Sequence, residues 1–144
     1  MFIDIKTDKP YTIMETNQQI VEGLYAAFSQ GNVPFILENV AENFTWQDPN
    51  DPAIVPHGGS YSGRREFLNF FQQLDADTAT LSFNVSDYAT ADNLVIATGQ
   101  HGVQAKKTGK PLTFEWTMVW RFENGVPVSG RSYYDTASAE KIYQ

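Results

Sequence analysis

The chain of 144 residues contains no cysteine. This absence excludes disulfide bonds, thiolate nucleophiles and cysteine-based zinc sites, and it is typical of proteins that work in a reducing compartment. The first residues, Met-Phe-Ile-Asp-Ile-Lys, lack the basic start and the long apolar stretch of a secretory signal. We therefore expect a cytoplasmic protein.

Clusters of basic residues are also missing. The sequence has 10 Lys and Arg against 17 Asp and Glu, a formal net charge of −7, and no basic run exceeds two residues. Binding to a nucleic-acid backbone needs a basic face, so we expect no nucleic-acid partner. No run of about 18 apolar residues occurs, so we expect no membrane span either.

Ligand patterns for metals and phosphates are absent as well. His57 and His101 are the only histidines, and they do not form an HxH or HxxxH pair. Histidines so far apart in the sequence are poor candidates for a zinc site. Gly58, Gly59 and Gly63 are not followed by the Lys-Ser/Thr pair of a phosphate-binding loop. We expect neither a metal nor a cofactor.

The N-terminal part of the sequence predicts an arm followed by a helix. Residues 1–15 show no firm period and are expected to form a loose arm or a short edge strand. Thr16, followed three residues later by Gln19, matches a capping box. Apolar residues then recur every three to four positions, which predicts a helix over 17–30. Gly31 ends this helix.

Two further helices are predicted. Asn32 caps the second, which runs to Val40. A long loop over 49–61 is rich in Pro, Gly and Asp, and long loops in compact domains are usually functional or mobile. The third helix begins after this loop, at Ser60 or Ser62.

From residue 78 onward, apolar and polar residues alternate, which predicts strands. Four long strands joined by hairpins follow a short strand over 44–48. Asn124-Gly125 gives the strongest hairpin signal, because both positions favour positive φ. Helices followed by hairpin-linked strands indicate a single α+β domain over 16–144 with an antiparallel sheet.

Four segments resemble the NTF2-like superfamily, in particular its SnoaL-like and ketosteroid-isomerase-like branch. The first is the end of the first helix, over 28–32, and the second, over 44–49, contains Trp-Gln-Asp-Pro. The third is a G-x-x-x-G-R segment before the third helix, over 58–64, and the fourth is the last hairpin, over 120–125 with 133–135. The resemblance implies a cone in which three helices pack on a strongly curved antiparallel sheet and enclose a pocket. It also implies a homodimer. This fold hosts many activities, so the function must come from the site.

Asp48 is the first catalytic candidate. The resemblance places it at the position of the isomerases' general base. Desolvation in an apolar site raises the pKa of a carboxyl group, which suits removal of a proton next to a carbonyl. The alternative is a loop carboxylate that caps the turn before Pro49.

The remainder of an isomerase site is incomplete. The resemblance places the expected acid donor on Met118, which cannot donate, and the expected tyrosine on Leu24, with Tyr25 one position away. Such donors stabilise the developing oxyanion, so their absence argues against steroid isomerisation. Tyr25 remains a candidate for substrate binding.

The sequence is rich in aromatic residues, with 10 Phe, 7 Tyr and 3 Trp. Strand alternation predicts that one set of large side chains faces inward: Trp46, Trp116, Met118, Trp120 and Tyr134. These side chains either line an apolar cavity for a small, flat, apolar or aromatic molecule or form ordinary core packing. Three indoles facing one space favour the cavity.

The two histidines have different expected settings. His101 lies in the middle of a strand and is expected to face inward. It is either a hydrogen-bonded core residue or, with Asp48 or Asp135, the His–Asp arrangement that the resemblance to polyketide cyclases implies. His57 lies in the long loop and is expected to be exposed, either without a role or as a proton shuttle at the pocket mouth.

Three functions fit these observations. The first is a cofactor-independent isomerase or cyclase that uses Asp48 as base on a cyclic or polyketide-like carbonyl compound. The second is a binding module for a small apolar molecule, without chemistry. The third is a protein-interaction domain, which predicts a filled cone and a large exposed apolar patch.

Overall fold

The first helix, α1 (Asn17–Ser29), begins where the sequence predicts, in a computed structural model that describes residues 15–144. Thr16 Oγ1 accepts a hydrogen bond from the Gln19 backbone N–H at 3.1 Å, and the Gln19 side chain accepts from the Thr16 N–H at 2.9 Å. This reciprocal pair satisfies two N–H groups at the helix start. The arm predicted over 1–15 lies outside the described residues, except for its last residue.

The second and third predicted helices are also present. α2 (Val33–Glu38) is capped by Asn32, whose side chain accepts from the Phe35 N–H at 3.3 Å. It ends two residues before the predicted Val40. α3 (Gly63–Asp77) follows the long loop. The prediction of three N-terminal helices is therefore confirmed.

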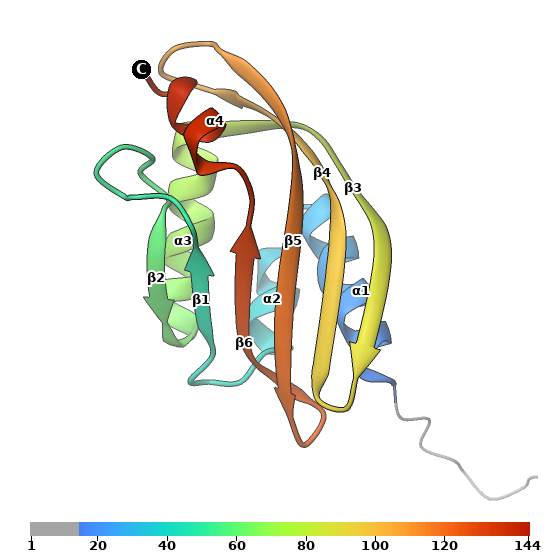
Figure 1. Cartoon of the computed structure of the whole chain (residues 1–144). Helices are drawn as coiled ribbons and strands as arrows, with labels where there is room; N and C mark the ends of the chain where they lie inside the picture. The colour runs from blue at the N-terminus through green and yellow to red at the C-terminus, as the bar shows by residue number, and fades with distance from the viewer. Residues whose placement is uncertain (1–14) are drawn as a thin grey trace, which may run out of the picture.

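A fourth helix, α4 (Thr136–Lys141), was not predicted. Asp135 caps it, because its carboxylate accepts hydrogen bonds from the N–H and the hydroxyl of Ser138. The helix has only six residues, too few for an apolar period to show in the sequence. Figure 1 shows α4 close to the end of α3.

Within residues 15–144, six strands form one sheet in the order β2-β1-β6-β5-β4-β3. Their bounds are β1 (Thr45–Asp48), β2 (Gly59–Ser62), β3 (Thr78–Ala91), β4 (Leu94–Ala105), β5 (Pro111–Glu123) and β6 (Val126–Tyr133). The four long strands are antiparallel neighbours, as predicted, but β1 pairs with β6 in parallel. The last residues of the predicted loop over 49–61 instead belong to β2, which pairs with β1. Without β2, the outer edge of β1 would have no backbone hydrogen-bond partners.

The sheet is strongly curved and wraps around the helices (Figure 1). Register shifts interrupt the pairing of β3 with β4 and of β5 with β6, and such bulges bend a strand and increase its twist. At the β5–β6 turn, Asn124 and Gly125 have φ of 50° and 77°, as a two-residue hairpin requires. The α+β class and the predicted packing of helices on a strongly curved sheet are confirmed.

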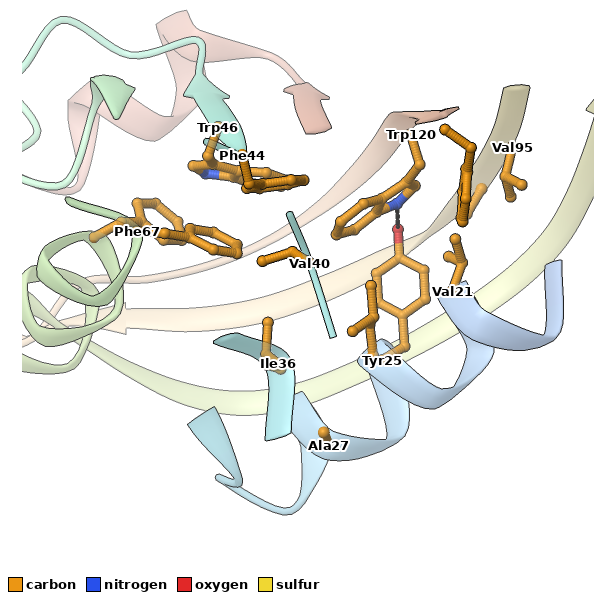
Figure 2. Packing of buried hydrophobic residues seen from close by; sticks show 14 of the residues in the cluster. Val21, Tyr25, Ala27, Ile36, Val40, Phe44, Trp46, Phe67, Val95 and Trp120 are labelled. Carbon is orange, nitrogen blue, oxygen red and sulfur yellow. Dashed lines mark hydrogen bonds between the residues drawn. The ribbon is translucent and has the colours of Figure 1, made fainter. Parts of the chain in front are cut away.

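The core lies between the concave face of the sheet and α1, α2 and α3. Figure 2 shows Trp46, Phe44 and Phe67 on one side of this core and Trp120 with Tyr25 on the other. Each of these side chains is buried. No helix among residues 15–144 is long and apolar enough to cross a membrane.

Candidate active site

A cavity of about 100 Å³ lies in the aromatic core. Its wall includes all nine site candidates from the sequence: Tyr25, Trp46, Asp48, His57, His101, Trp116, Met118, Trp120 and Tyr134. The inward orientation predicted from strand alternation is thus confirmed. Pockets for drug-sized ligands span roughly 300–1,000 Å³, so this cavity suits a much smaller molecule.

Asp48 ends β1 with its side chain on the buried face, and the residue is 8% exposed. Its two carboxylate oxygens each accept a hydrogen bond from the Tyr134 hydroxyl at 2.9 Å, and Oδ1 also accepts from the Asn50 N–H at 3.1 Å. Burial raises the pKa of Asp48, although attraction to His57 and these hydrogen bonds oppose the rise. A carboxyl group with a raised pKa is suited to general acid–base chemistry.

Asn50 is a member of this group that the sequence did not reveal. Its side-chain N–H donates to the Tyr134 hydroxyl oxygen, which leaves the Tyr134 O–H directed at Asp48. Burial, followed by the charge of Asp48, raises the pKa of Tyr134, so the phenol stays protonated. The side-chain oxygen of Asn50 is buried and has no hydrogen-bond partner among residues 15–144.

His57 is buried, at 7% exposure, so the prediction of an exposed loop histidine is wrong. Several groups in its surroundings exclude water from the ring, including Phe70 and Tyr143, with ring centroids 6.1 and 6.3 Å away. Its Nε2 lies 4.0 Å from Asp48 Oδ2. Its Nδ1 forms a 2.9 Å hydrogen bond with Asp77 Oδ1.

Asp77, the last residue of α3, was also missed by the sequence analysis. Its Oδ1 accepts hydrogen bonds from Thr78 Oγ1 and, at 3.1 Å, from the Tyr143 hydroxyl, in addition to the contact with His57. Burial alone would raise the pKa of Asp77, but the hydrogen bonds and the attraction to His57 outweigh it and lower the pKa. Asp77 therefore stays ionised beside His57.

His101 faces inward from β4, as predicted, and is buried. Its Nε2 lies 3.0 Å from Thr80 Oγ1, and Phe28, Phe83 and Phe114 surround its ring. No hydrogen bond or ion pair among the described residues joins it to Asp48 or to Asp135, which is exposed. Burial lowers the pKa of His101 to about 4. The catalytic role of His101 stays a prediction, and the histidine that approaches Asp48 is His57.

Tyr25 carries a hydroxyl deep in the core. It accepts a hydrogen bond from Trp120 Nε1 at 2.9 Å, drawn in Figure 2, and donates to Met118 Sδ at 3.2 Å. A thioether sulfur is a weak acceptor. The Tyr25 O–H could therefore turn from Met118 to a better acceptor, such as a carbonyl oxygen.

Two of the three indoles have unpartnered N–H groups. Trp46 Nε1 and Trp116 Nε1 are buried without a hydrogen-bond partner among residues 15–144. Buried donors of this kind are rare. A ligand oxygen that reached either indole would remove the cost of leaving it unpaired.

The described part of the chain has no cluster of three or more His, Cys, Asp and Glu side chains that could hold a metal ion. The groups brought together are instead two carboxylates, an imidazole and two phenols: Asp48, Asp77, His57, Tyr134 and Tyr143. Such a set can accept, hold and return protons.

Solved structures share this fold over nearly their whole length. An NTF2-like protein of unknown function from Burkholderia pseudomallei is 26% identical, with a TM-score of 0.83 over 91% of this chain and 99% of that one. TerC, co-crystallised with polyporic acid, is 16% identical, with a TM-score of 0.80 over 88% and 97%. A hypothetical protein with a ketosteroid-isomerase-like fold from Catenulispora acidiphila, in complex with trimethylamine, is 19% identical, with a TM-score of 0.73 over 89% and 94%.

The two structures with less than 20% identity show a likeness of fold alone. No curated protein matches this sequence. A family model does match, and it covers residues 21–128, most of the chain and every strand up to the start of β6. This chain belongs to the family of SnoaL-like domains.

Proposed function

We propose that this chain is a cofactor-independent isomerase or cyclase in which Asp48 removes a proton from the carbon next to a carbonyl group. The buried Asp48 carboxylate in the cavity wall carries this proposal. Its raised pKa makes it a stronger base than an exposed carboxylate, and it remains able to return the proton.

The Tyr25 hydroxyl supplies the donor that the enolate oxygen needs. Family resemblance alone left this donor position unfilled, because Met118 occupies the place of the expected acid. In the folded chain the Tyr25 O–H rests on the Met118 sulfur, a weak acceptor that a substrate carbonyl can replace. Trp120 donates to the same hydroxyl oxygen, which makes the Tyr25 O–H a better donor.

The size of the cavity limits the substrate. About 100 Å³ accommodates a single small ring but not a fused multi-ring skeleton. The wall is mainly aromatic and aliphatic, with polar groups at few positions. We therefore favour a monocyclic carbonyl compound over a steroid or an extended polyketide.

Proton exchange tests this function without knowledge of the natural substrate. A panel of monocyclic ketones and diketones would be incubated with the protein in D₂O, and loss of the α-proton signal would be followed by NMR. We expect exchange above the buffer rate for at least one compound. Asp48→Asn should reduce it by about 10²- to 10⁴-fold, the usual contribution of a positioned base.

Asp87→Asn is the matched control, because Asp87 is an exposed aspartate on β3 away from the cavity. It should exchange at the wild-type rate. Full activity in Asp48→Asn would contradict the assignment of Asp48 as base.

The second candidate is a binding module without chemistry. The two unpartnered indole N–H groups support it, since they favour a ligand with oxygen acceptors whether or not it reacts. Binding of a compound from the panel with no exchange in the wild type would favour this function over the first.

A further inference from the structure

Three side chains form a row that begins in the cavity wall and ends at the partly exposed Asp77. Asp48 ends β1, His57 lies in the loop that follows, and Asp77 ends α3. Asp48 and His57 are buried, whereas Asp77 is partly exposed. His57 Nε2 lies 4.0 Å from Asp48, and His57 Nδ1 lies 2.9 Å from Asp77.

The contact with Asp77 selects which histidine nitrogen faces the cavity. An ionised carboxylate accepts hydrogen bonds only, so Asp77 holds the proton of a neutral His57 ring on Nδ1. Nε2 then carries a lone pair and points toward Asp48. The 4.0 Å separation exceeds a hydrogen bond, but catalytic hydrogen bonds are often long before substrate binds.

Asp77 is itself held by residues from two other elements. Tyr143, which follows α4, donates to Asp77 Oδ1 at 3.1 Å and lies 2.7 Å from Thr78 Oγ1. Thr78, the first residue of β3, donates to the same carboxylate. A carboxylate with three donors on one oxygen has little freedom to rotate away from His57.

We propose that His57 takes up the proton that Asp48 removes from the substrate, and that Asp77 and Tyr143 are positioning residues that hold its ring for this transfer. The proposal rests on the proposed role of Asp48. It adds a second acid–base group to the site and gives Tyr143, in the segment after α4, a role in the reaction.

The transfer is balanced in protons. Asp48, protonated by the substrate carbon, passes its proton to Nε2 of the neutral imidazole and becomes a carboxylate again. The imidazolium then lies between two carboxylates, Asp48 and Asp77, which stabilise its charge. It gives the Nε2 proton back through Asp48 to the product carbon, or first exchanges it for a proton from water that then takes the same route. Both outcomes protonate the product carbon and restore the neutral ring with its proton on Nδ1.

Among residues 15–144, the side chains of Asp48 on β1, Asp77 at the end of α3 and Tyr143 after α4 face the His57 ring. The Tyr61 hydroxyl on β2 donates to the His57 backbone carbonyl, and His101 on β4 interacts with His57 electrostatically. His101 stays neutral near pH 7, because burial lowers its pKa to about 4.

Nitrogen NMR of the histidine rings tests the positioning without any substrate. The chain has two histidines, so ¹⁵N-histidine labelling gives a simple spectrum. The signals that disappear in His57→Asn belong to His57, and those that remain belong to His101. We expect the neutral His57 ring to carry its proton on Nδ1. Asp77→Ala should shift the proton to Nε2, the form that a free histidine ring prefers in water. Asp75→Ala, an exposed aspartate on the same helix, should leave the spectrum unchanged.

Tyr143→Phe keeps the aromatic ring and removes only the hydroxyl. We expect it to weaken the preference of His57 for a proton on Nδ1, whereas Tyr88→Phe, which alters a tyrosine outside this cluster, should not. If Asp77→Ala fails to fold, the comparison of Tyr143→Phe with Tyr88→Phe still tests the positioning role of Tyr143. An unchanged His57 spectrum in both Asp77→Ala and Tyr143→Phe would overturn the proposal.

Activity measurements distinguish failure of the proposed proton relay from failure of the proposed function on which it rests. For a ketone that exchanges with the wild type, His57→Asn and Asp77→Ala should lower the turnover by about 10²-fold at unchanged KM. Loss of exchange in Asp48→Asn together with full exchange in His57→Asn would refute the relay and leave the base intact. Full exchange in Asp48→Asn would refute the function, whatever the NMR spectra show.

Discussion

The Tyr134 hydroxyl lies 2.9 Å from both carboxylate oxygens of Asp48. One O–H therefore bridges the two oxygens, and it lowers the pKa of Asp48 against the effect of burial. Tyr134 thus tunes the base that we assign to the reaction.

Tyr134→Phe removes this donor and should raise the pKa of Asp48 further. The acidic limb of the pH–rate profile should move to higher pH, because Asp48 would lose its proton only at a higher pH. The carboxyl ¹³C signal of Asp48, followed by NMR across the same pH range, measures the shift directly. An identical titration in the wild type and in Tyr134→Phe would show that this hydrogen bond is absent in solution.

Asp48→Asn should stabilise the folded chain at neutral pH. A carboxyl group whose pKa is raised by folding contributes stability below its unfolded value, near 3.8, and this contribution is lost as the pH rises through the folded value. The variant should therefore resist urea better than the wild type at pH 7, and the difference should shrink as the pH falls toward 3.8. Asp87→Asn serves as the control and should show no such pH-dependent gain.

His101 should make the fold sensitive to mild acid. Its pKa falls from 6.5 to about 4 on folding, so between these values the unfolded chain binds a proton that the folded chain does not. Stability then falls as the pH drops from 6.5 to 4, by about 3 kcal/mol in total. His101→Phe removes this titration and places a phenyl ring in a cluster that already contains Phe28 and Phe83. Between pH 6.5 and pH 4, the urea midpoint of the variant should therefore change less than that of the wild type. A parallel fall in both proteins would contradict the prediction.

Gly99 lets Trp116 pack closely against the sheet. A Cβ added at Gly99 would collide with the Asn84 carbonyl oxygen and lie 2.5 Å from Trp116 Cζ2. Gly99→Ala should therefore displace the indole from the cavity wall and destabilise the fold by about 1–3 kcal/mol. Gly23→Ala is the matched control, because its Cβ would meet nothing nearer than 3.9 Å within α1. It should be neutral or stabilising by up to about 1 kcal/mol, and both are measured by chemical denaturation.

Local patterns in the sequence were enough to predict most of the fold. The Thr16–Gln19 capping box and the Asn124-Gly125 turn depend on neighbouring residues alone, and both form as expected. The alternation around Trp116 and Trp120 likewise placed these side chains on the inner face. α4 was missed because a helix of six residues shows little period, although the Asp135–Ser138 spacing is a helix-capping signal.

The candidate site was predicted only in part. Family resemblance pointed to Asp48, and strand parity pointed to the aromatic wall. The pairing of His57 with Asp77 joins a loop to a helix end 20 residues later, a tertiary contact that no local pattern encodes. Tyr143 was missed for the same reason, because its partner lies 66 residues earlier. The homodimer implied by the resemblance stays a prediction.

Every tryptophan of the sequence lines the same small cavity. The intrinsic fluorescence of the protein therefore comes from indoles that a bound molecule would approach closely, and no indole elsewhere in the chain adds a constant background. Intrinsic tryptophan fluorescence should therefore report whether the cavity is occupied. A library of unlabelled compounds can thus be screened by emission alone, before any turnover is known.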